Sequence, residues 1–386
     1  PWTYPLGSAS GRGTQRSPMP NSLQQLQQAR GARTNSEGLL LTYGDVQREY
    51  RAGREGAALF DTTARGRVEV AGADRLEFLH RLLANRVRGL EPGQGNHNLL
   101  LNSKGKILFG FDLAARPESL ELSTEPGQGP ALLKALDMYL FADKVQLFDR
   151  SAAAAPLALV GPAAQRLIAE RIGPPPAADR WWTEVDWQGL RLRIERGVHA
   201  GSPAWFLDAG PAAAPAVFEA LTEAGATPAG RVAEDFLRVE AGQAAFGADV
   251  DENIYPQEAR LERCFALDKG CYIGQEVVAK IDTYGGLNKR LCLLSIDHDE
   301  PLPRGVKLIG EDPERGGERE LGILTSWAYS FVLDRGLALG YVKRRHQAPG
   351  RSFALRGPAD QALAGQATIV PMPVRPDGLP VSGEFE

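Results

Sequence analysis

KGCYIGQE, residues 269–276, is the most distinctive stretch of this sequence. Its two glycines free the backbone, and the apolar residues 277–279 that follow it predict a helix. Cys271 would then lie just ahead of a helix N-terminus and close to Lys269, where the dipole and the positive charge both favour thiolate over thiol. We interpret Cys271 as a reactive catalytic thiol and Lys269 as its electrostatic partner. The alternative is a buried cysteine that only fills space, since free cysteines are commonly buried.

The composition is that of a globular protein with two or three domains. The chain has 386 residues, of which 43% are hydrophobic and 24% charged, and its formal net charge is −4. This balance argues against a protein that coats nucleic acid, and we interpret the basic clusters at 85–88 and 343–346 as solvated faces. No run of residues approaches 18 apolar positions, so no membrane helix is predicted.

The cysteines and histidines give no indication of a metal site. Three cysteines cannot make a disulfide framework in a chain of this size, and they fit a reducing compartment. The sequence contains no CxxC pair and no HxxxH spacing, so no metal is expected. It also lacks a Walker A motif, a GxSxG motif and a GxGxxG after a strand, which argues against nucleotide-binding and hydrolase functions.

Residues 1–37 are predicted to be a disordered tail or leader. They are rich in Ser, Gly, Pro and Gln and carry one acidic residue, Glu37, so they cannot bury enough apolar surface to fold alone. An acid-poor leader with Arg and Ser also resembles an organelle transit peptide. We therefore expect a bacterial cytoplasmic protein, with the mitochondrial matrix as the alternative if residues 1–37 are a transit peptide.

Hydrophobic periodicity over residues 38–286 predicts a domain of mixed helices and strands, in the α+β class. Val68 and Val70 alternate with charged residues, as in a half-buried strand, and the spacing of Leu76, Leu79 and Leu83 predicts a helix. The proline run 174–176 interrupts regular secondary structure. Two subunits of about 38–150 and 151–286 are expected. Further strands are predicted at 99–101, 107–113, 187–193 and 205–207, and further helices at 130–141, 215–224 and 232–239.

The pattern of predicted secondary structure changes after residue 286. Short strand-like segments separated by glycine turns replace the helices, and six such segments at this spacing predict a small barrel over residues 287–386. The predicted strands are 291–296, 307–309, 321–327, 337–342, 352–355 and 367–369.

The motif KGCYIGQE resembles the signature of the YgfZ branch of the glycine-cleavage T-protein (aminomethyltransferase) family. Other stretches follow the family's order: AALFD (57–61), RVEVAGAD (67–74), LRVEAG (237–242), PQE (256–258), GILTSWAYS (322–330) and LALGYVK (337–343). The resemblance spans about residues 40–345. It implies an aminomethyltransferase-like folate-binding fold, in which two α+β units form a ring and a six-stranded β-barrel follows at the C-terminus.

Two departures from the aminomethyltransferases affect the expected chemistry. In those enzymes a pair of aspartates follows a glycine-rich turn, but Phe109-Gly110 stands at that place here, and Asp112 lies two residues further on. A carboxylate displaced by about 7 Å along a strand would not meet the same substrate atom. The family's GYTGE-type turn, whose Tyr and a later Glu hold the pterin, reads Gly197-Val198-His199-Ala200-Gly201. The contacts to the pterin must therefore differ.

The resemblance also implies residues that bind the folate. Arg238 matches the arginine of LRVEAG, and its guanidinium can bind a carboxylate or a pterin edge, or it can pair with Glu240 on the surface. Glu240 is a candidate ligand residue, although a structural role is favoured over ligand binding. Arg290 matches a basic site near the start of the final domain and is suited to the folate glutamate tail, or it is a solvated charge at the start of a strand.

The resemblance implies a tetrahydrofolate-binding accessory protein that supports assembly or repair of iron–sulfur clusters in client enzymes. Tetrahydrofolate or a derivative is the expected cofactor, and the expected partners are iron–sulfur client or assembly proteins. A single cysteine cannot hold an iron–sulfur cluster alone, so the protein would assist the assembly of clusters rather than store them. We expect a monomer without independent turnover. The alternative is a folate-dependent aminomethyltransferase of the glycine cleavage type.

Overall fold

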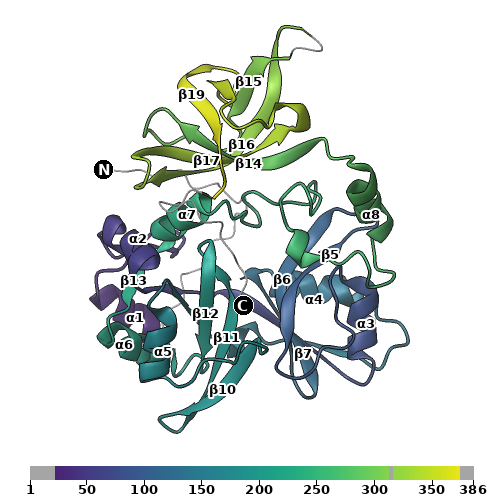
Figure 1. Cartoon of the computed structure of the whole chain (residues 1–386). Coiled ribbons are helices and arrows are strands. Elements are labelled where there is room, and N and C mark those ends of the chain that lie inside the picture. The colour runs from purple at the N-terminus through teal and green to yellow at the C-terminus, as the bar shows by residue number, and fades with distance from the viewer. Residues whose placement is uncertain (1–21, 313–315, 374–386) are drawn as a thin grey trace.

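The computed structural model describes residues 22–312 and 316–373. In these ranges the chain forms two α+β units that lie side by side, with a β-barrel above them (Figure 1). The first unit is an antiparallel sheet of strand order β5-β6-β7-β4-β8, with two helices packed on one face. Its elements are β4 (Arg65–Ala71), α3 (Arg75–Leu82), β5 (Gly95–Leu101), β6 (Ile107–Ala115), β7 (Ser119–Pro126), α4 (Gly129–Asp137) and β8 (Gln146–Asp149).

Alternating side chains build the core of the first unit. Val68 and Val70 are fully buried, as their spacing predicts, and they pack with Phe78 and Leu79 of α3 and with Leu132 of α4. The opposite face of the same strands presents polar residues to the second unit, because side chains alternate along a strand. This face contains the candidate site.

The second unit is a mixed sheet of strand order β10-β11-β12-β9-β3-β13, in which β13 runs parallel to β3. Its strands are β3 (Ala58–Asp61), β9 (Leu157–Val160), β10 (Trp182–Trp187), β11 (Leu190–His199), β12 (Ser202–Asp208) and β13 (Thr227–Ala229). Its helices are α2 (Val46–Glu55), α5 (Ala164–Arg171), α6 (Ala214–Glu223) and α7 (Arg231–Glu240). Strand β3 precedes the first unit in sequence but pairs with β9, so a single cut near residue 150 does not separate the two sheets.

The prediction of a disordered tail is wrong for residues 22–37. Helix α1 (Ser22–Ala29) and strand β1 (Arg33–Thr34) lie there, and β1 pairs with β2 (Leu40–Thr42). Leu23 is buried in the core of the second unit beside Phe218 of α6, and Gln27 donates a hydrogen bond to Asp61 at 2.8 Å. A short amphipathic helix gains this burial only from its tertiary partner, which local composition does not reveal. Residues 1–21 lie outside the described residues.

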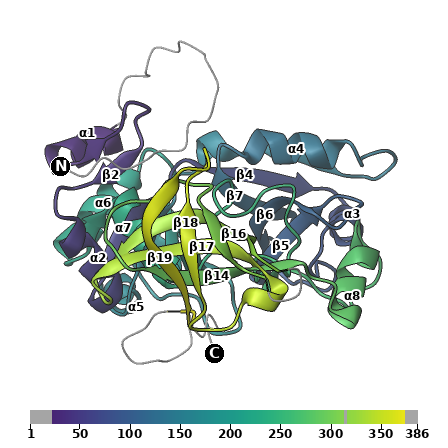
Figure 2. The ribbon, with the colours of Figure 1, turned by 90° about the horizontal axis from the view of Figure 1, so that it is seen from above.

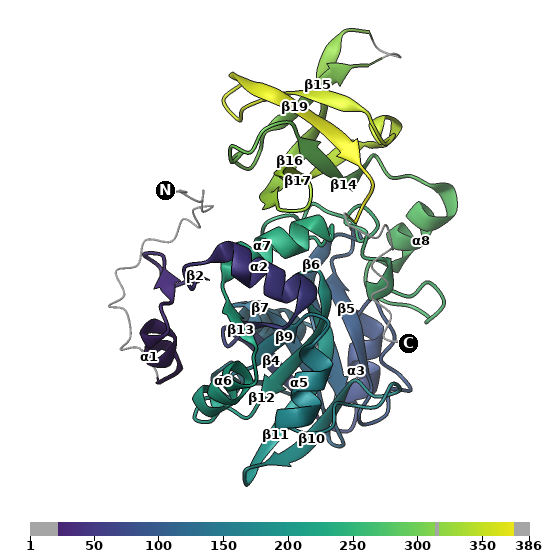
Figure 3. The ribbon, with the colours of Figure 1, turned by 60° about the vertical axis from the view of Figure 1, so that its left-hand side comes forward.

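The C-terminal part is a closed barrel of strand order β14-β17-β16-β15-β18-β19, as predicted. Its strands are β14 (Lys289–Ile296), β15 (Lys307–Glu311), β16 (Glu318–Ser330), β17 (Arg335–Lys343), β18 (Ser352–Arg356) and β19 (Ala362–Val370). Helix α8 (Gln275–Tyr284) leads into β14. Figure 2 looks down on the barrel, with α1 and α2 on one side and α3 and α8 on the other, and Figure 3 shows α7 and α2 below it. Single 3-10 turns lie at η1 (Ser151–Ala153), η2 (Glu262–Cys264) and η3 (Arg344–His346).

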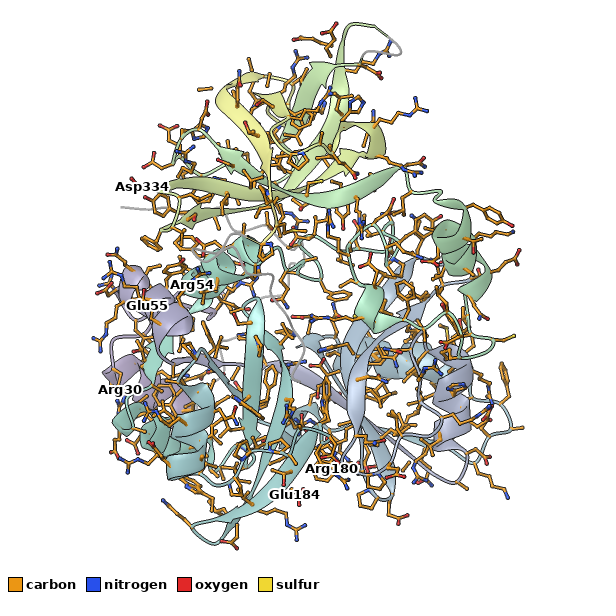
Figure 4. The ribbon with its side chains drawn as sticks, in the orientation of Figure 1. Arg30, Arg54, Glu55, Arg180, Glu184 and Asp334 are labelled. Carbon is orange, nitrogen blue, oxygen red and sulfur yellow. The ribbon has the colours of Figure 1, made fainter. Side chains whose placement is uncertain are left out.

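A buried network of alternating charges joins the two α+β units. Arg67 contacts Asp208 at 2.5 Å, and Arg116 contacts Glu195 at 2.5 Å, each pair crossing from the first unit to the second. Arg193 reaches back to Glu121. Outside this network, the exposed Arg180, labelled in Figure 4 where the lower ends of the units meet, donates to the Pro92 carbonyl at 2.6 Å. Because each charge has an opposite partner, the network fixes how the two sheets face each other.

No helix among the described residues is both long enough and apolar enough to cross a membrane.

Candidate functional site

The loop that contains KGCYIGQE packs against the first unit. Gly270 and Gly274 have positive φ angles of 94° and 81°, which favour glycine. A Cβ atom at Gly274 would lie 2.6 Å from the carbonyl oxygen of Asn102 and 2.9 Å from the Cα of Gly105, so the loop needs glycine to approach the β5–β6 turn. The helix predicted after this loop is α8, which begins at Gln275.

Lys269 has a structural role that the sequence did not indicate. Its ammonium donates to the carbonyl oxygens of His80 and Leu83, both at 2.5 Å, so it caps the carboxyl end of α3. Its own carbonyl contacts the His80 ring nitrogen at 3.0 Å. Burial lowers the pKa of Lys269 to about 8. The charge therefore anchors the loop to α3.

Cys271 is exposed, whereas Cys264 and Cys292 are buried. Burial raises the pKa of Cys264 to about 12 and also raises the pKa of Cys292. The thiolate of these two residues is therefore scarce near neutral pH, and reagents reach them poorly.

Iodoacetamide near pH 7 is expected to modify Cys271 well before Cys264 or Cys292, because Cys271 alone of the three is exposed in the described chain. Peptide mass mapping over time measures the order. Cys271→Ser is expected to change the free energy of unfolding by less than about 0.5 kcal/mol, as exposed substitutions usually do. First reaction at Cys264 or Cys292, or unfolding of Cys271→Ser, contradicts this placement.

Arg238 is buried and bound by protein groups. Its guanidinium contacts Asp235 at 2.5 Å, Asp249 at 2.9 Å and the Ser326 hydroxyl on β16 at 3.0 Å. The predicted alternative, a surface pair with Glu240, is wrong. Because the guanidinium is committed to these partners, Arg238 joins α7 to the barrel and is a poor candidate for binding folate.

Glu240 is also committed to a structural network. It is fully buried and accepts hydrogen bonds from Tyr50 at 2.6 Å and from Ser330 at 2.5 Å. Arg54 of α2, labelled in Figure 4, lies 3.6 Å from the same carboxylate. Burial raises the pKa of Glu240, and the hydrogen bonds from Ser330 and Tyr50 oppose this rise. The residue therefore links α2, α7 and the barrel.

Arg290 lies at the start of β14, as the family resemblance implied. It contacts Glu262 at 2.5 Å, and both side chains are partly exposed. This arrangement is that of a half-buried surface ion pair, and such pairs contribute little to stability. The structure brings none of the three predicted folate residues to the polar face between the two α+β units.

An aromatic ring fills the space beside Gly110, one of the two positions at which the family resemblance implies aspartates. Gly110 on β6 is buried, and a Cβ atom there would lie 2.0 Å from Cζ of Phe246. Real Cβ contacts are never this short, so Phe246 occupies the space that a side chain at position 110 would need. Phe246 follows α7 and belongs to the motif-bearing stretch after LRVEAG, but its position over β6 could not be predicted from spacing.

A narrow crevice separates the polar faces of the two units. Arg65, Asp112 and Ser123 line it from the first unit, and Glu195 and Phe206 line it from the second. Its cavity volume of about 10 Å³ is room for about one water molecule. The guanidinium of Arg65 stacks on the ring of Phe206 at 4.5 Å and so spans the crevice.

Asp112, which lines the crevice from the first unit, is ionised. It accepts from Arg65 at 3.0 Å and contacts Nδ1 of His97, its cross-strand partner, at 2.6 Å. Desolvation alone would raise the pKa of Asp112, but His97 and Arg65 outweigh it and hold the pKa well below its usual range. The ring edge of Trp181 packs on His97 at 5.1 Å. The crevice thus contains a carboxylate that stays charged at neutral pH.

Asp112→Asn is expected to destabilise the protein by about 1–3 kcal/mol at pH 7, since it removes the carboxylate that Arg65 contacts directly. The folded pKa of Asp112 is depressed, so its stabilisation is full above the unfolded pKa of about 4 and is lost as pH falls below it. The difference between wild type and variant should therefore shrink between about pH 5 and pH 2. Urea unfolding across this range measures it, with the exposed Asp137→Asn as control. A difference that stays constant with pH contradicts the assignment.

The second unit holds an imidazole with an unused nitrogen, which packs against Phe206 of the crevice. The ring of His199 packs edge-on against Phe60 at 5.0 Å and Phe206 at 6.1 Å. Its Nε2 is buried without a hydrogen-bond partner among the described residues and lies 3.8 Å from Oε1 of Glu234 on α7. Burial lowers the pKa of His199, and Arg65 and Arg231 lower it further, while Glu234 opposes them.

Sequence reasoning noticed Asp112 and His199 but missed Arg65, Phe206 and Glu234. These residues come from β4, β12 and α7, and they meet only because the two sheets pack face to face. A charged residue at the start of a strand, such as Arg65, was the available signal, but many solvated strand ends share it.

Comparisons with known proteins agree with this architecture. An aminomethyltransferase of Saccharopolyspora erythraea is 28% identical over 360 residues, covering 89% of this chain and 95% of that protein. An aminomethyltransferase of Rubrobacter xylanophilus is 30% identical over 303 residues, covering 78% and 80%. The crystal structure of the glycine cleavage system aminomethyltransferase T from Bartonella henselae has a TM-score of 0.78 at 23% identity, covers 91% of this chain and 96% of its own, and supports the fold.

The matches favour the family as a whole and do not single out the YgfZ branch. Residues 39–269 match the GCVT N-terminal domain, and residues 289–374 match the glycine cleavage T-protein C-terminal barrel domain. The predicted aminomethyltransferase-like fold with a six-stranded barrel is thereby confirmed. This chain belongs to the glycine cleavage T-protein family.

Proposed function

We propose that this protein binds a reduced folate between its two α+β units and supports iron–sulfur cluster assembly or repair in client enzymes, without transferring aminomethyl groups itself. The observation that carries the proposal is the ring of Phe246 over Gly110. An enzyme that needs a carboxylate at this place cannot have one while an aromatic ring fills the space. The exposed thiol of Cys271 lies on a separate loop and is free to serve a client protein.

The crevice residues suit a folate better than the residues predicted from the family motifs. A pteridine ring carries several N–H donors, and Glu125 and Glu234 supply carboxylates near Arg65. The unused Nε2 of His199 adds a polar atom that a ligand can satisfy. Because the crevice holds about one water molecule, binding requires its walls to separate.

A second candidate function is the aminomethyltransferase reaction itself. Several relatives that match over most of their length carry this name, and this favours the second candidate over the accessory role. Tetrahydrofolate binding is expected under both functions, so the transfer reaction separates them. In that reaction a bound folate would accept the one-carbon unit, while residues of this chain would bind and orient it.

Two measurements test the proposal. Calorimetric titration with tetrahydrofolate is expected to show one binding site per chain. In cells that lack the protein, wild type is expected to restore the activity of iron–sulfur enzymes, and Cys271→Ser is expected to fail although it folds and binds folate as before. Absence of folate binding contradicts the first half of the proposal, and full complementation by Cys271→Ser contradicts the thiol's role.

A further inference from the structure

We propose that Lys269 and His80 form a proton-controlled clamp, which holds the arch of residues 269–272 against α3 and positions the Cys271 thiol. This inference rests on the proposed function, because it assigns two positioning residues to the thiol that serves a client protein there. It also adds a control on that thiol. The arch opens more readily when the Lys269 amine is protonated, and it closes more tightly when the amine loses its proton.

The first observation is the path of the chain around Cys271. Lys269 and Tyr272 are buried, each with 7% of its surface exposed, whereas Gly270 and Cys271 between them are exposed. Gly270 has a φ angle of 94°, and a Cβ atom there would meet no other atom within 4 Å, so the chain projects into solvent at this residue. The two buried side chains therefore fix both ends of the arch, and Cys271 lies between them.

The second observation is that Lys269 and His80 bind each other in both directions. The Lys269 ammonium donates to the carbonyl oxygens of His80 and Leu83 at the end of α3. The His80 Nδ1 accepts from the backbone N–H groups of Val87 and Arg88 at 3.3 and 3.1 Å, so the ring proton is on Nε2. Nε2 then donates to the Lys269 carbonyl oxygen at 3.0 Å. This reciprocal pair fixes both the backbone and the side chain of Lys269.

The third observation is that a positive charge at this position is unfavourable. Burial lowers the pKa of Lys269 to about 8, and Arg88 and Arg86 act in the same direction, while Glu77 opposes them. A solvated lysine has a pKa of about 10.4. The open arch, in which the amine is solvated, therefore binds a proton more tightly than the closed arch does. Opening becomes less favourable as the pH rises from about 8 to about 10.

The ion pairs beside the clamp keep their charges over this range. Arg88 pairs with Glu77 at 2.6 Å, and Arg86 pairs with Asp268 at 2.5 Å. Carboxylates and guanidinium groups titrate far from pH 8. The charge that these four residues present to Lys269 is therefore constant between pH 7 and pH 8.5.

The two rings that contact Lys269 also keep their protonation states. Burial lowers the pKa of His80, and the Lys269 charge lowers it further, so this imidazole is neutral. The ring of Tyr272 lies 5.0 Å from the Lys269 ammonium, and burial raises the pKa of Tyr272 to about 12. The remaining neighbour is the Cys271 thiol, which the experiment removes.

Trypsin cleavage after residue 269 measures how often the arch opens, because a side chain that is bound to α3 cannot enter the protease. The initial rate is divided by the rate of cleavage after the exposed Arg335, which corrects for the pH dependence of trypsin. In Cys271→Ser, we expect this relative rate to fall about fourfold between pH 7 and pH 8.5. Lys269→Arg in the same background keeps the cleavage site and stays charged, so its relative rate should not change with pH. A constant rate in Cys271→Ser, or an equal fall in both proteins, overturns the proton control.

His80→Leu removes the hydrogen bond to the Lys269 carbonyl oxygen and tests the other half of the clamp. We expect it to raise the relative rate at pH 7 by at least about fivefold, the loss of one hydrogen bond. His80→Gln keeps a donor and an acceptor and should recover most of the protection. His298→Leu, in the barrel, is the matched control and should be cleaved as wild type is.

Complementation of cells that lack the protein tests whether the clamp serves the thiol. His80→Leu is expected to restore less than about a fifth of the iron–sulfur enzyme activity that wild type restores, and His80→Gln is expected to restore most of it. If His80→Leu is cleaved like wild type, or complements fully although its arch opens, the clamp is wrong and the proposed function stands. Full complementation by Cys271→Ser overturns the proposed function whatever the cleavage rates are.

Discussion

Arg238→Ala is expected to lower the free energy of unfolding by about 3–5 kcal/mol, the range measured when one partner of a buried ion pair is removed. The variant leaves the buried carboxylates of Asp235 and Asp249 without the guanidinium that they face at 2.5 and 2.9 Å. It also removes the hydrogen bond to Ser326, which joins α7 to the barrel. The barrel should therefore become less firmly attached to the α+β units.

Urea unfolding at pH 7 measures this effect, and Arg335→Ala is the control because Arg335 is exposed on the barrel. A loss below about 1 kcal/mol for Arg238→Ala would place the residue among surface ion pairs, whose contributions are of that size. Normal stability combined with lost folate affinity would instead restore the role that the family resemblance implied for Arg238.

Gly110→Asp is the second substitution with a large expected effect. Its Cβ atom would overlap Phe246, so the ring must leave its site on β6, and a carboxylate would enter a buried position. Deleting a packed phenylalanine side chain lowers the free energy of unfolding by about 3–5 kcal/mol. Forcing an extra side chain into a packed region lowers it by a similar amount or less. We expect a loss of about 3 kcal/mol or more in the free energy of unfolding.

The double variant Gly110→Asp with Phe246→Ala tests the cause. Because the two side chains compete for one space, the combined loss should be smaller than the sum of the two single losses. Gly286→Asp is the matched control, since Gly286 is exposed and a Cβ atom there would meet no other atom within 4 Å. Strict additivity would mean that Phe246 does not occupy the place of a side chain at position 110.

Elements defined by local pattern were predictable. The six barrel strands have alternating or fully apolar segments between glycine turns, and each lies where the periodicity placed it. The helix after KGCYIGQE and the β5–β6 hairpin were predictable for the same reason. Helix α1 was missed because its burial depends on α6, about 190 residues further along the chain.

The candidate site was only partly predictable. The motif LRVEAG drew attention to Arg238, but its partners Asp249 and Ser326 lie 11 and 88 residues away, and spacing does not show that they meet. The departure at Phe109-Gly110 indicated that a carboxylate was missing, whereas the ring that replaces it comes from another part of the chain. The sequence therefore indicated that a carboxylate is absent at position 110, and only the packed structure shows that the ring of Phe246 occupies that space.

The most direct test of the central claim is an aminomethyl transfer assay with purified protein. Tetrahydrofolate and an aminomethylated lipoyl carrier are supplied together, and formation of methylenetetrahydrofolate is followed at protein concentrations that bind the folate. With Phe246 over Gly110, we predict a rate indistinguishable from the reaction without protein. Turnover well above that background would contradict the proposal and assign this chain to the aminomethyltransferases themselves.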